Sequence, residues 1–459
     1  MRHKYAILAL VVFVILAGSL MYVRAENEKY HHHAEADSGL LVGDEVSEDD
    51  FPDQGSRLWV YGNANEDDVI DDADVRYLEE VIAGTRGPTQ LSDANLDGSV
   101  DASDIAHVRS MILGNMMDVY YIDNYFLNAK VTWPVDSVAI GYCSGAYTAD
   151  VTGVCGKVDM VDTTIEKYWN VMNSNFRSSE SYGTTESPNY EKIIGAGIDV
   201  YVVGYCDKEA DRISNSKLNP AGVDVMFIST ADNSGVDYPN EHIDRSILMF
   251  AYLLQGDMSK TYKYLEWHDS VLSTLVDATA SLTDDEKEAF MMARSSPLYS
   301  TGGISITGKD NTNNIHAEWV GVHAVGQHSP TLGKNYQTLT PEQVITVVKE
   351  NSKHGRMFYM DNAHDGMRGQ YSLKDCVEAD KEMLASSDTD VRYLAMARET
   401  GNSPLYVVEL AFYVCAMYPE IAESAGIDYE DLFNHYFDTF ASEDYSDEVS
   451  DIEKFFYIA

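Results

Sequence analysis

Two copies of a short acidic loop, each followed by a helical apolar pattern, constrain this sequence more than any other feature. The first copy is NANEDDVIDDADVRYLEEVIAG (Asn63–Gly84), and the second is DANLDGSVDASDIAHVRSMILG (Asp93–Gly114). Calcium takes about six to eight hard oxygen ligands from a short, flexible loop. The spacing of carboxylates and amides in both copies therefore predicts two calcium-binding loops, each closed by a helix.

The two loops are not equivalent. Gly98 permits the sharp turn at position 6 of the second loop, whereas the first loop has Asp68 there and Asn63 instead of a carboxylate at position 1. We therefore expect weaker calcium binding by the first loop. The expected Ca²⁺ ligands, with the main-chain carbonyl at position 7, are Asn63, Asn65, Asp67, Val69, Asp71 and Asp74 in the first loop and Asp93, Asn95, Asp97, Ser99, Asp101 and Asp104 in the second.

The duplicated loops resemble a dockerin module. Position 12 is Asp where ordinary EF-hands have Glu, a single helix follows each loop, and the two loops are in tandem. The resemblance implies a small all-α, EF-hand-like module at residues 57–116 that binds a cohesin domain of a surface or scaffold protein when calcium is present. In dockerins, loop positions 10 and 11 help to choose the partner; here they are Asp72-Ala73 and Ala102-Ser103.

The N-terminal segment has the pattern of an exported protein. Arg2 and Lys4 precede an uncharged apolar run, Tyr5–Val23, so residues 1–25 are interpreted as a signal peptide or an N-terminal membrane anchor. Either one places the rest of the chain outside the cytoplasm, secreted or anchored to the outer face of the cytoplasmic membrane. Residues 26–56 are acidic and are expected to form a flexible linker. This linker contains His31–His33, which could bind a metal, but a solvated linker explains them better.

The charge balance limits the partners of the chain. With 32 Lys and Arg against 75 Asp and Glu, the formal net charge is 32 − 75 = −43. Such a negative field repels phosphate backbones, so nucleic acid is an improbable partner. The 45% hydrophobic content still suffices for a sizeable core.

The large C-terminal region, 117–459, has an α/β pattern. Apolar runs at 135–142, 198–205 and 223–230 are typical of buried parallel strands separated by helices. A long helical pattern follows, with one apolar stripe that includes Leu265, Leu272 and Leu275. We therefore predict two α/β lobes, at about 117–240 and 283–459, bridged by one long helix at about 258–282.

This layout resembles the ABC-importer substrate-binding proteins for iron chelates, haem and cobalamin. The segments that carry the resemblance are 187–204 (SPNYEKIIGAGIDVYVVG), 253–275, 339–360 (LTPEQVITVVKENSKHGRMFYM) and 403–440. It implies a binding protein and not an enzyme, which delivers a metal chelate such as a ferric siderophore, haem or a corrinoid to an ABC permease. In that family one Glu on each lobe contacts the permease; these would be Glu191 and Glu342, although a first-turn Glu is also favoured by the helix dipole. Gly197-Ile198-Asp199 departs from the Pro-Asp usual in the family.

The chelate would bind between the lobes, in loops that follow the strands. Aromatic, His and Arg side chains suit a planar or anionic chelate, although ordinary packing is the more frequent role for any one of them. The candidate cleft residues are Tyr142, Ser144, Arg177, Tyr182 and Tyr205 on the first lobe and His316, Trp319 and His323 on the second.

Two other functions fit the same sequence. Dockerins usually address extracellular carbohydrate-active enzymes, and a hydrolase of that kind would need a cleft with two carboxylates about 5–10 Å apart between aromatic sugar platforms. The other alternative is a non-catalytic, calcium-dependent scaffold or adhesion protein, which would have no closed cleft.

Overall fold

The computed structural model describes most of the chain after the acidic linker. The apolar run at 5–23 lies outside the described residues, as do Arg177 and Tyr205. Among the helices that are described, none is both long enough and apolar enough to cross a membrane. The described residues are 43–46, 51–53, 55–166, 176, 179–203, 208–228, 239–294, 297–298, 302–309, 311–333, 335–363, 371–401, 403–441 and 451–459.

The first lobe is built on a parallel sheet of the order β5-β4-β3-β8-β9. Three of its strands, β3, β8 and β9, lie in the three predicted apolar runs, which confirms those runs as parallel strands. The strands are β3 (Val138–Ile140), β4 (Val158–Val161), β5 (Glu180–Ser181), β8 (Val200–Val202) and β9 (Asp224–Met226), with the short hairpin β6 (Gly183–Thr184) and β7 (Ser187–Pro188) beside them. The helices are α4 (Tyr142–Val151), α5 (Tyr190–Ala196) and α6 (Lys208–Leu218).

The second lobe has a mixed sheet of the order β13-β11-β10-β14-β15-β16, with β12 paired to β10. Strands β10, β14 and β15 are parallel neighbours at its centre. The strands are β10 (Ala289–Ala293), β11 (Ile304–Thr307), β12 (His323–Ala324), β13 (Tyr336–Leu339), β14 (Arg356–Ala363), β15 (Asp390–Ala397) and β16 (Phe456–Ile458). The helices are α9 (Thr312–Trp319), α10 (Val325–His328), α11 (Pro341–Asn351), α12 (Leu373–Leu384), α13 (Arg398–Gly401), α14 (Tyr406–Met417), α15 (Pro419–Ala425) and α16 (Tyr429–Thr439).

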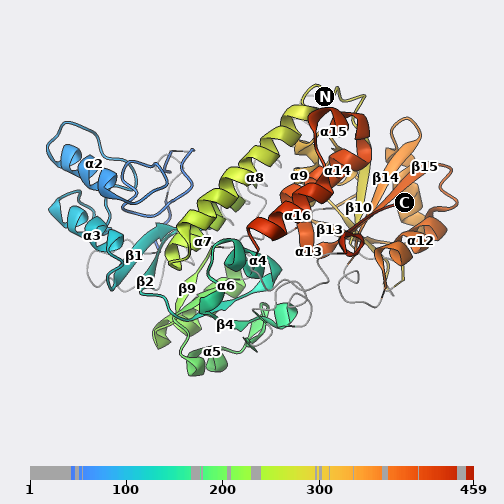
Figure 1. The fold of residues 1–459 in the computed structure, drawn as a ribbon. Helices are drawn as coiled ribbons and strands as arrows, with labels where there is room; N and C mark the ends of the chain where they lie inside the picture. The colour runs from blue at the N-terminus through green and yellow to red at the C-terminus, as the bar shows by residue number, and fades with distance from the viewer. Residues whose placement is uncertain are drawn as a thin grey trace, which may run out of the picture.

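A long helix, α8 (Met258–Thr279), connects the two lobes (Figure 1). It starts at Asp257, whose side chain accepts a hydrogen bond from the Lys260 amide and so satisfies one of the free N–H groups of the first turn. It packs against α4 and α7 (Pro239–Leu253) on the first-lobe side and against α14 and α15 on the second-lobe side. Its buried stripe includes Leu265, Leu272 and Leu275, as the periodicity predicts.

The two copies of the acidic repeat contain α2 (Asp72–Ile82) and α3 (Ala102–Ile112), which pack against each other beside the hairpin β1 (Met117–Ile122) and β2 (Asn128–Trp133). The segment before the first loop adds an edge to this hairpin, because Tyr61 N donates to Tyr120 O and Ile122 N donates to Trp59 O, both at 3.0 Å. One apolar cluster continues from Leu58 into the first lobe. The domain boundary predicted at residue 116 therefore crosses a continuous core.

We expect Leu275→Ala, near the C-terminal end of α8, to destabilise the whole protein. Leu275 is fully buried, so its truncation leaves a cavity that costs about 2–5 kcal/mol of the free energy of unfolding. Glu266→Ala, on the exposed side of α8, is the control and should change this free energy by no more than about 0.5 kcal/mol. Urea denaturation followed by circular dichroism measures both; equal effects of the two substitutions would contradict the role given to the stripe.

Candidate functional site

The carboxyl ends of the central strands of both lobes approach each other at one place. In open α/β sheets ligands bind outside the carboxyl ends of the strands. Tyr142 follows β3 on the first lobe, and Arg398 follows β15 on the second. Arg398 Nη2 donates a hydrogen bond to Tyr142 Oη at 3.2 Å, so a guanidinium and a phenol bridge the two lobes at this edge. The candidate ligand site lies between these two strand ends.

Asp162, directly after β4, holds the first-lobe side of this edge. Tyr142 has a positive φ of 61°, and its amide donates to Asp162 Oδ2 at 3.0 Å. The buried carboxylate also accepts from Ile165 N at 2.8 Å and from Thr185 Oγ1 at 2.9 Å. These hydrogen bonds hold the loop that carries Tyr142 in place. The role of Asp162 is therefore structural.

The segment that carries Arg398 rests on a buried acid, Glu409 of α14. A Cβ on Gly401 would lie 2.6 Å from Glu409 Oε2, so a larger residue there would require the Glu409 side chain to shift. Glu409 Oε1 accepts from Asn313 Nδ2 at 3.3 Å and from Tyr413 Oη. Burial raises the pKa of Glu409 to about 7.

A pair of buried acids also lies in the same lobe. Asp361 of β14 and Asp380 of α12 are both fully buried. Burial, and then the adjacent Asp361 carboxyl, raise the pKa of Asp380 well above its usual range. Burial and the neighbouring carboxyl therefore favour the protonated form of Asp380 inside the lobe.

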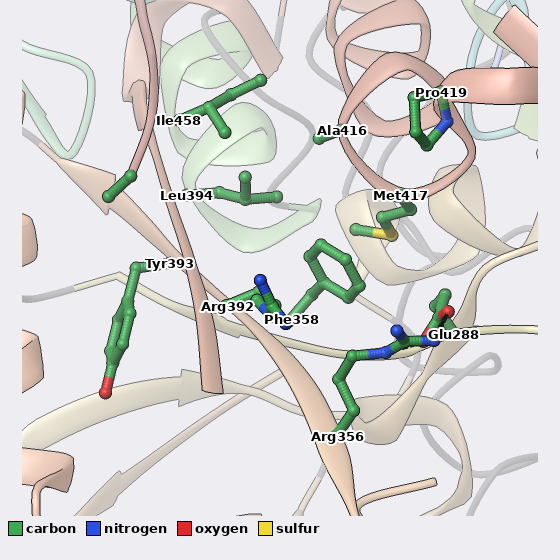
Figure 2. A pocket seen from close by; sticks show the side chains of 11 residues that line it. Glu288, Arg356, Phe358, Arg392, Tyr393, Leu394, Ala416, Met417, Pro419 and Ile458 are labelled. Carbon is green, nitrogen blue, oxygen red and sulfur yellow. Dashed lines mark hydrogen bonds and ion pairs between the residues drawn. The ribbon is translucent and has the colours of Figure 1, made fainter. Parts of the chain in front are cut away.

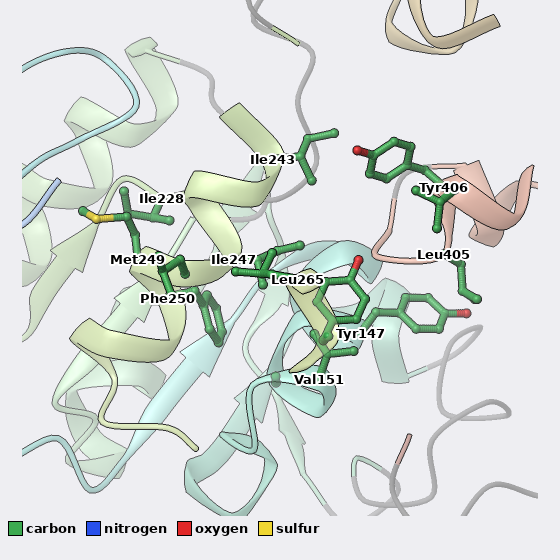
Figure 3. Close-up of a cluster of buried hydrophobic side chains, with 14 of the residues drawn as sticks. Tyr147, Val151, Ile228, Ile243, Ile247, Met249, Phe250, Leu265, Leu405 and Tyr406 are labelled. Carbon is green, nitrogen blue, oxygen red and sulfur yellow. The ribbon is translucent and has the colours of Figure 1, made fainter. Parts of the chain in front are cut away.

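An apolar cluster closes the space between the lobes beside α8 (Figure 3). Tyr147 and Val151 come from α4, and Ile247 comes from α7, while Leu405 and Tyr406 come from the start of α14 in the second lobe. All five are buried. The lobes therefore share a packed apolar contact next to the candidate site, and this contact limits how far they can separate.

Three of the predicted cleft residues are packed in the interior. Ser144 and Tyr182 are buried in the first lobe, where Tyr182 packs edge-on against Tyr201 at 5.4 Å between ring centroids. His316 is fully buried between Trp319, at 4.4 Å, and Tyr406, at 4.8 Å. Tyr142 is the predicted residue that the structure places at the facing strand ends.

His323 lies elsewhere, at the amino end of the second-lobe sheet. It is aligned with Ala289, the first residue of β10, so it is at the opposite edge from Arg398. Burial, and then the neighbouring His328 and Lys353, lower the pKa of His323.

The two proposed docking glutamates are exposed at helix starts on different lobes. Glu191 is in the first turn of α5, and Glu342 is in the first turn of α11. The capping box of α11 is made by Thr340 and Gln343, so Glu342 is not needed for it. Each helix leads directly into a parallel strand, β8 or β14, which places both glutamates at the edge where the strands end.

The two acidic loops have matching geometry. Asp74 accepts hydrogen bonds from Asn65 N at 3.1 Å and Asp71 N at 2.9 Å, and Asp104 accepts from the equivalent Asn95 N at 3.1 Å and Asp101 N at 2.8 Å. Both carboxylates are fully buried, and burial raises the pKa of Asp74 to about 6. The buried Asn63 Oδ1 has no hydrogen-bond partner in the described structure. Clustered oxygens with this unmet charge and bonding capacity fit Ca²⁺.

Asp68 holds the first loop against the rest of the protein, a role that the loop pattern does not predict. Its φ of 69° shows that Asp can make this turn. Asp68 Oδ1 accepts from Arg57 N at 2.6 Å and Leu58 N at 2.7 Å, and its carbonyl accepts from Tyr262 Oη of α8 at 2.6 Å. The only sign of this role in the sequence is that Asp68 is an acidic residue at loop position 6, where glycine is preferred.

The pocket shown in Figure 2, of about 280 Å³, is a poor candidate for the ligand site. It lies at the amino ends of β14 and β15, away from Arg398. Its arginines already have partners: Arg356 forms two hydrogen bonds with Glu288, and Arg392 Nη2 lies 2.9 Å from Asp390 Oδ2. These pairs satisfy the charges that an anionic ligand would need.

The raised pKa of Glu409 predicts a pH-dependent stability. The folded state holds the proton more tightly than the unfolded state, whose pKa is near 4.5, so the stabilisation is complete below that pH and is lost as the pH rises through 7. The free energy of unfolding of the wild type should therefore fall between about pH 5 and about pH 8. Urea denaturation at these two pH values should show that Glu409→Gln makes this fall smaller by up to about 3 kcal/mol. The exposed Glu420→Gln is the control; a decline that persists unchanged in Glu409→Gln would refute this assignment.

Comparisons with known proteins identify the fold. No protein-family profile and no curated protein sequence matches the chain. The TroA-like periplasmic binding protein FepB from Veillonella parvula is 13% identical, with a TM-score of 0.55, over 71% of this chain and 97% of FepB. The molybdate-bound periplasmic binding protein MolA from Haemophilus influenzae is 14% identical (TM-score 0.54; 70% and 97% covered), and CeuE from Helicobacter pylori with bound Ni(II) is 14% identical (TM-score 0.52; 72% and 98% covered).

These similarities confirm the predicted α/β architecture. The chain has a mixed α/β fold similar to that of the TroA-like periplasmic binding protein FepB, of MolA and of CeuE. At this level of identity the similarity defines the fold, and the bound solute has to be inferred from the site.

Proposed function

We propose that this protein is an extracytoplasmic solute-binding protein that delivers an iron-type metal chelate to an ABC importer. The observation that carries the proposal is the Tyr142–Arg398 hydrogen bond between the facing strand ends of the two lobes. A solute bound there would contact both lobes at once, as the delivery of a captured solute requires.

The charge at this edge favours an anionic or metal-containing solute. The planar guanidinium of an arginine such as Arg398 can bind carboxylate, hydroxamate or phosphate oxygens in pairs. Tyr142 adds an aromatic face and a hydroxyl. Two proteins that share the fold have metal-containing solutes bound, Ni(II) in CeuE and molybdate in MolA. A ferric siderophore, haem or a corrinoid combines these properties.

Permease contact is proposed for Glu191 and Glu342. Both are exposed, and they are on different lobes at the edge that carries the ligand site. Two carboxylates in this arrangement can bind two basic groups of a permease together only when the lobes have the right separation. Because α8 and the apolar cluster join the lobes, closure on the solute should be small.

The two acidic loops are proposed to bind Ca²⁺ as a dockerin-like tether to a cohesin domain. Bound calcium supplies positive charge that compensates the carboxylates of each loop. The chain itself prepares both sites: the helix-start residues Asp71 and Asp101 cap α2 and α3, and Asp74 and Asp104 are held by two amides each. With residues 1–25 as a signal or anchor, the protein would work at the cell surface.

The rival proposal of a carbohydrate-active enzyme has less support at this edge. Its active site needs one carboxylate free to act as a base or nucleophile. Asp162, the carboxylate after β4, is buried and accepts hydrogen bonds from four groups, Tyr142 N, Thr164 Oγ1, Ile165 N and Thr185 Oγ1.

Arg398→Ala should weaken solute binding about tenfold or more, because a charge-assisted hydrogen bond contributes about 1.5–3 kcal/mol. Titration of the full chain with haem, cobalamin and a ferric hydroxamate siderophore, followed by absorbance or fluorescence, measures the dissociation constants. Arg392→Ala is the matched control, because it removes the same residue type from the other end of β15. If none of these solutes binds and the protein turns over a glycan, the transport proposal is wrong.

Asp104→Asn should raise the calcium dissociation constant of the tighter loop about tenfold or more, because the substitution removes a buried ligand charge. Isothermal titration calorimetry of the wild type should resolve two unequal sites. Asp74→Asn should affect only the weaker one, and the exposed Asp438→Asn is the control. Identical titration curves for Asp104→Asn and Asp438→Asn would rule out the second loop as a calcium site.

A further inference from the structure

Three potential metal ligands come together at the amino edge of the second-lobe sheet. Glu318 is near the end of α9, His323 begins β12, and His328 ends α10. One ligand atom from each of them lies within 4.8 Å of the others. His328 Nε2 is 2.9 Å from Glu318 Oε1, and the two imidazole rings stack at 4.3 Å between centroids with an angle of 6°.

The backbone around these side chains is firmly held. Glu318 Oε1 accepts a hydrogen bond from Ala324 N at 2.8 Å, and His323 N donates to Glu288 O at 2.9 Å. Between them the chain turns at Gly321, whose φ is 73° and whose carbonyl accepts from Tyr418 Oη at 2.7 Å. The three ligands are therefore brought together by the fold before any metal binds, so little ordering is needed on binding.

The ligand set selects the metal. Two imidazoles and one carboxylate suit Zn²⁺, Ni²⁺, Co²⁺ or Cu²⁺, whereas Ca²⁺ and Mg²⁺ prefer oxygen ligands alone. We propose that Glu318, His323 and His328 form a binding site for a divalent transition-metal ion of the zinc class, with water completing the coordination. Because His328 is half exposed, the ion can enter from solvent.

This site is separate from the proposed solute site and from the calcium loops. It is at the amino end of β10, whereas Arg398 follows the carboxyl end of β15. Lys287 and Lys353 lie near enough to act electrostatically on His323. Their positive charges oppose a bound cation, so we expect weaker binding than at a structural zinc site.

The test is zinc titration calorimetry on the full, untagged chain with calcium in excess to fill the acidic loops. The three linker histidines His31, His32 and His33 are replaced by Gln in every sample, so that they do not compete for the metal. This background should bind one equivalent of Zn²⁺, and Co²⁺ should give visible absorption bands typical of nitrogen and oxygen ligands.

His323→Gln, His328→Gln and Glu318→Gln should each weaken zinc binding about tenfold or more. The control is His354→Gln, which removes an exposed histidine from the turn before β14 and should leave the affinity unchanged. His328→Gln keeps the test informative if the more buried variants fold poorly. Unchanged zinc affinity in His328→Gln and Glu318→Gln would overturn the proposal. The dissociation constant for the solute should equal that of the wild type in these variants. Loss of zinc binding therefore tests the metal site without testing the proposed transport function.

Discussion

Helix α8 is the element on which the rest of the structure depends, because it contacts all three parts of the chain. Its buried stripe packs against both lobes, and Tyr264 Oη donates to Pro404 O at 2.8 Å at the start of the last large helical segment. On the N-terminal side, Tyr262 binds the carbonyl of Asp68, and Arg57 Nη1 lies 2.9 Å from Asp269 Oδ2. One helix thus sets the positions of the lobes and of the calcium-loop segment.

The functional proposals follow from this arrangement. Because α8 and the apolar cluster hold the lobes together, the ends of β3 and β15 stay close enough for Arg398 to reach Tyr142. A solute would need to displace or bridge only this contact, and the permease would detect a small change in the separation of Glu191 and Glu342. The first acidic loop contacts the same helix through Tyr262, and one apolar cluster joins the segment around Leu58 to both lobes.

The features that sequence reasoning captured are local ones. The strands β3, β8 and β9 are short apolar runs, so pattern alone identifies them. The proposed Ca²⁺ ligands of each acidic loop also lie within twelve residues, and they stay a prediction. Arg398 could not be found in this way, since its importance depends on the packing of the two lobes on α8, which brings the end of β15 near the end of β3. His316 and Tyr182 have side chains that suit a ligand site, but aromatic packing buries both, and composition does not distinguish these roles.

The most direct test of the central claim is hydrogen exchange of the full chain with and without a ferric hydroxamate siderophore, haem or cobalamin. If the facing strand ends form the solute site, a bound solute slows amide exchange in 141–151 of the first lobe and in 398–401 of the second at the same time. Exchange at 318–328 stays the same. Protection confined to a single lobe, or to the acidic loops, would contradict a solute site between the lobes.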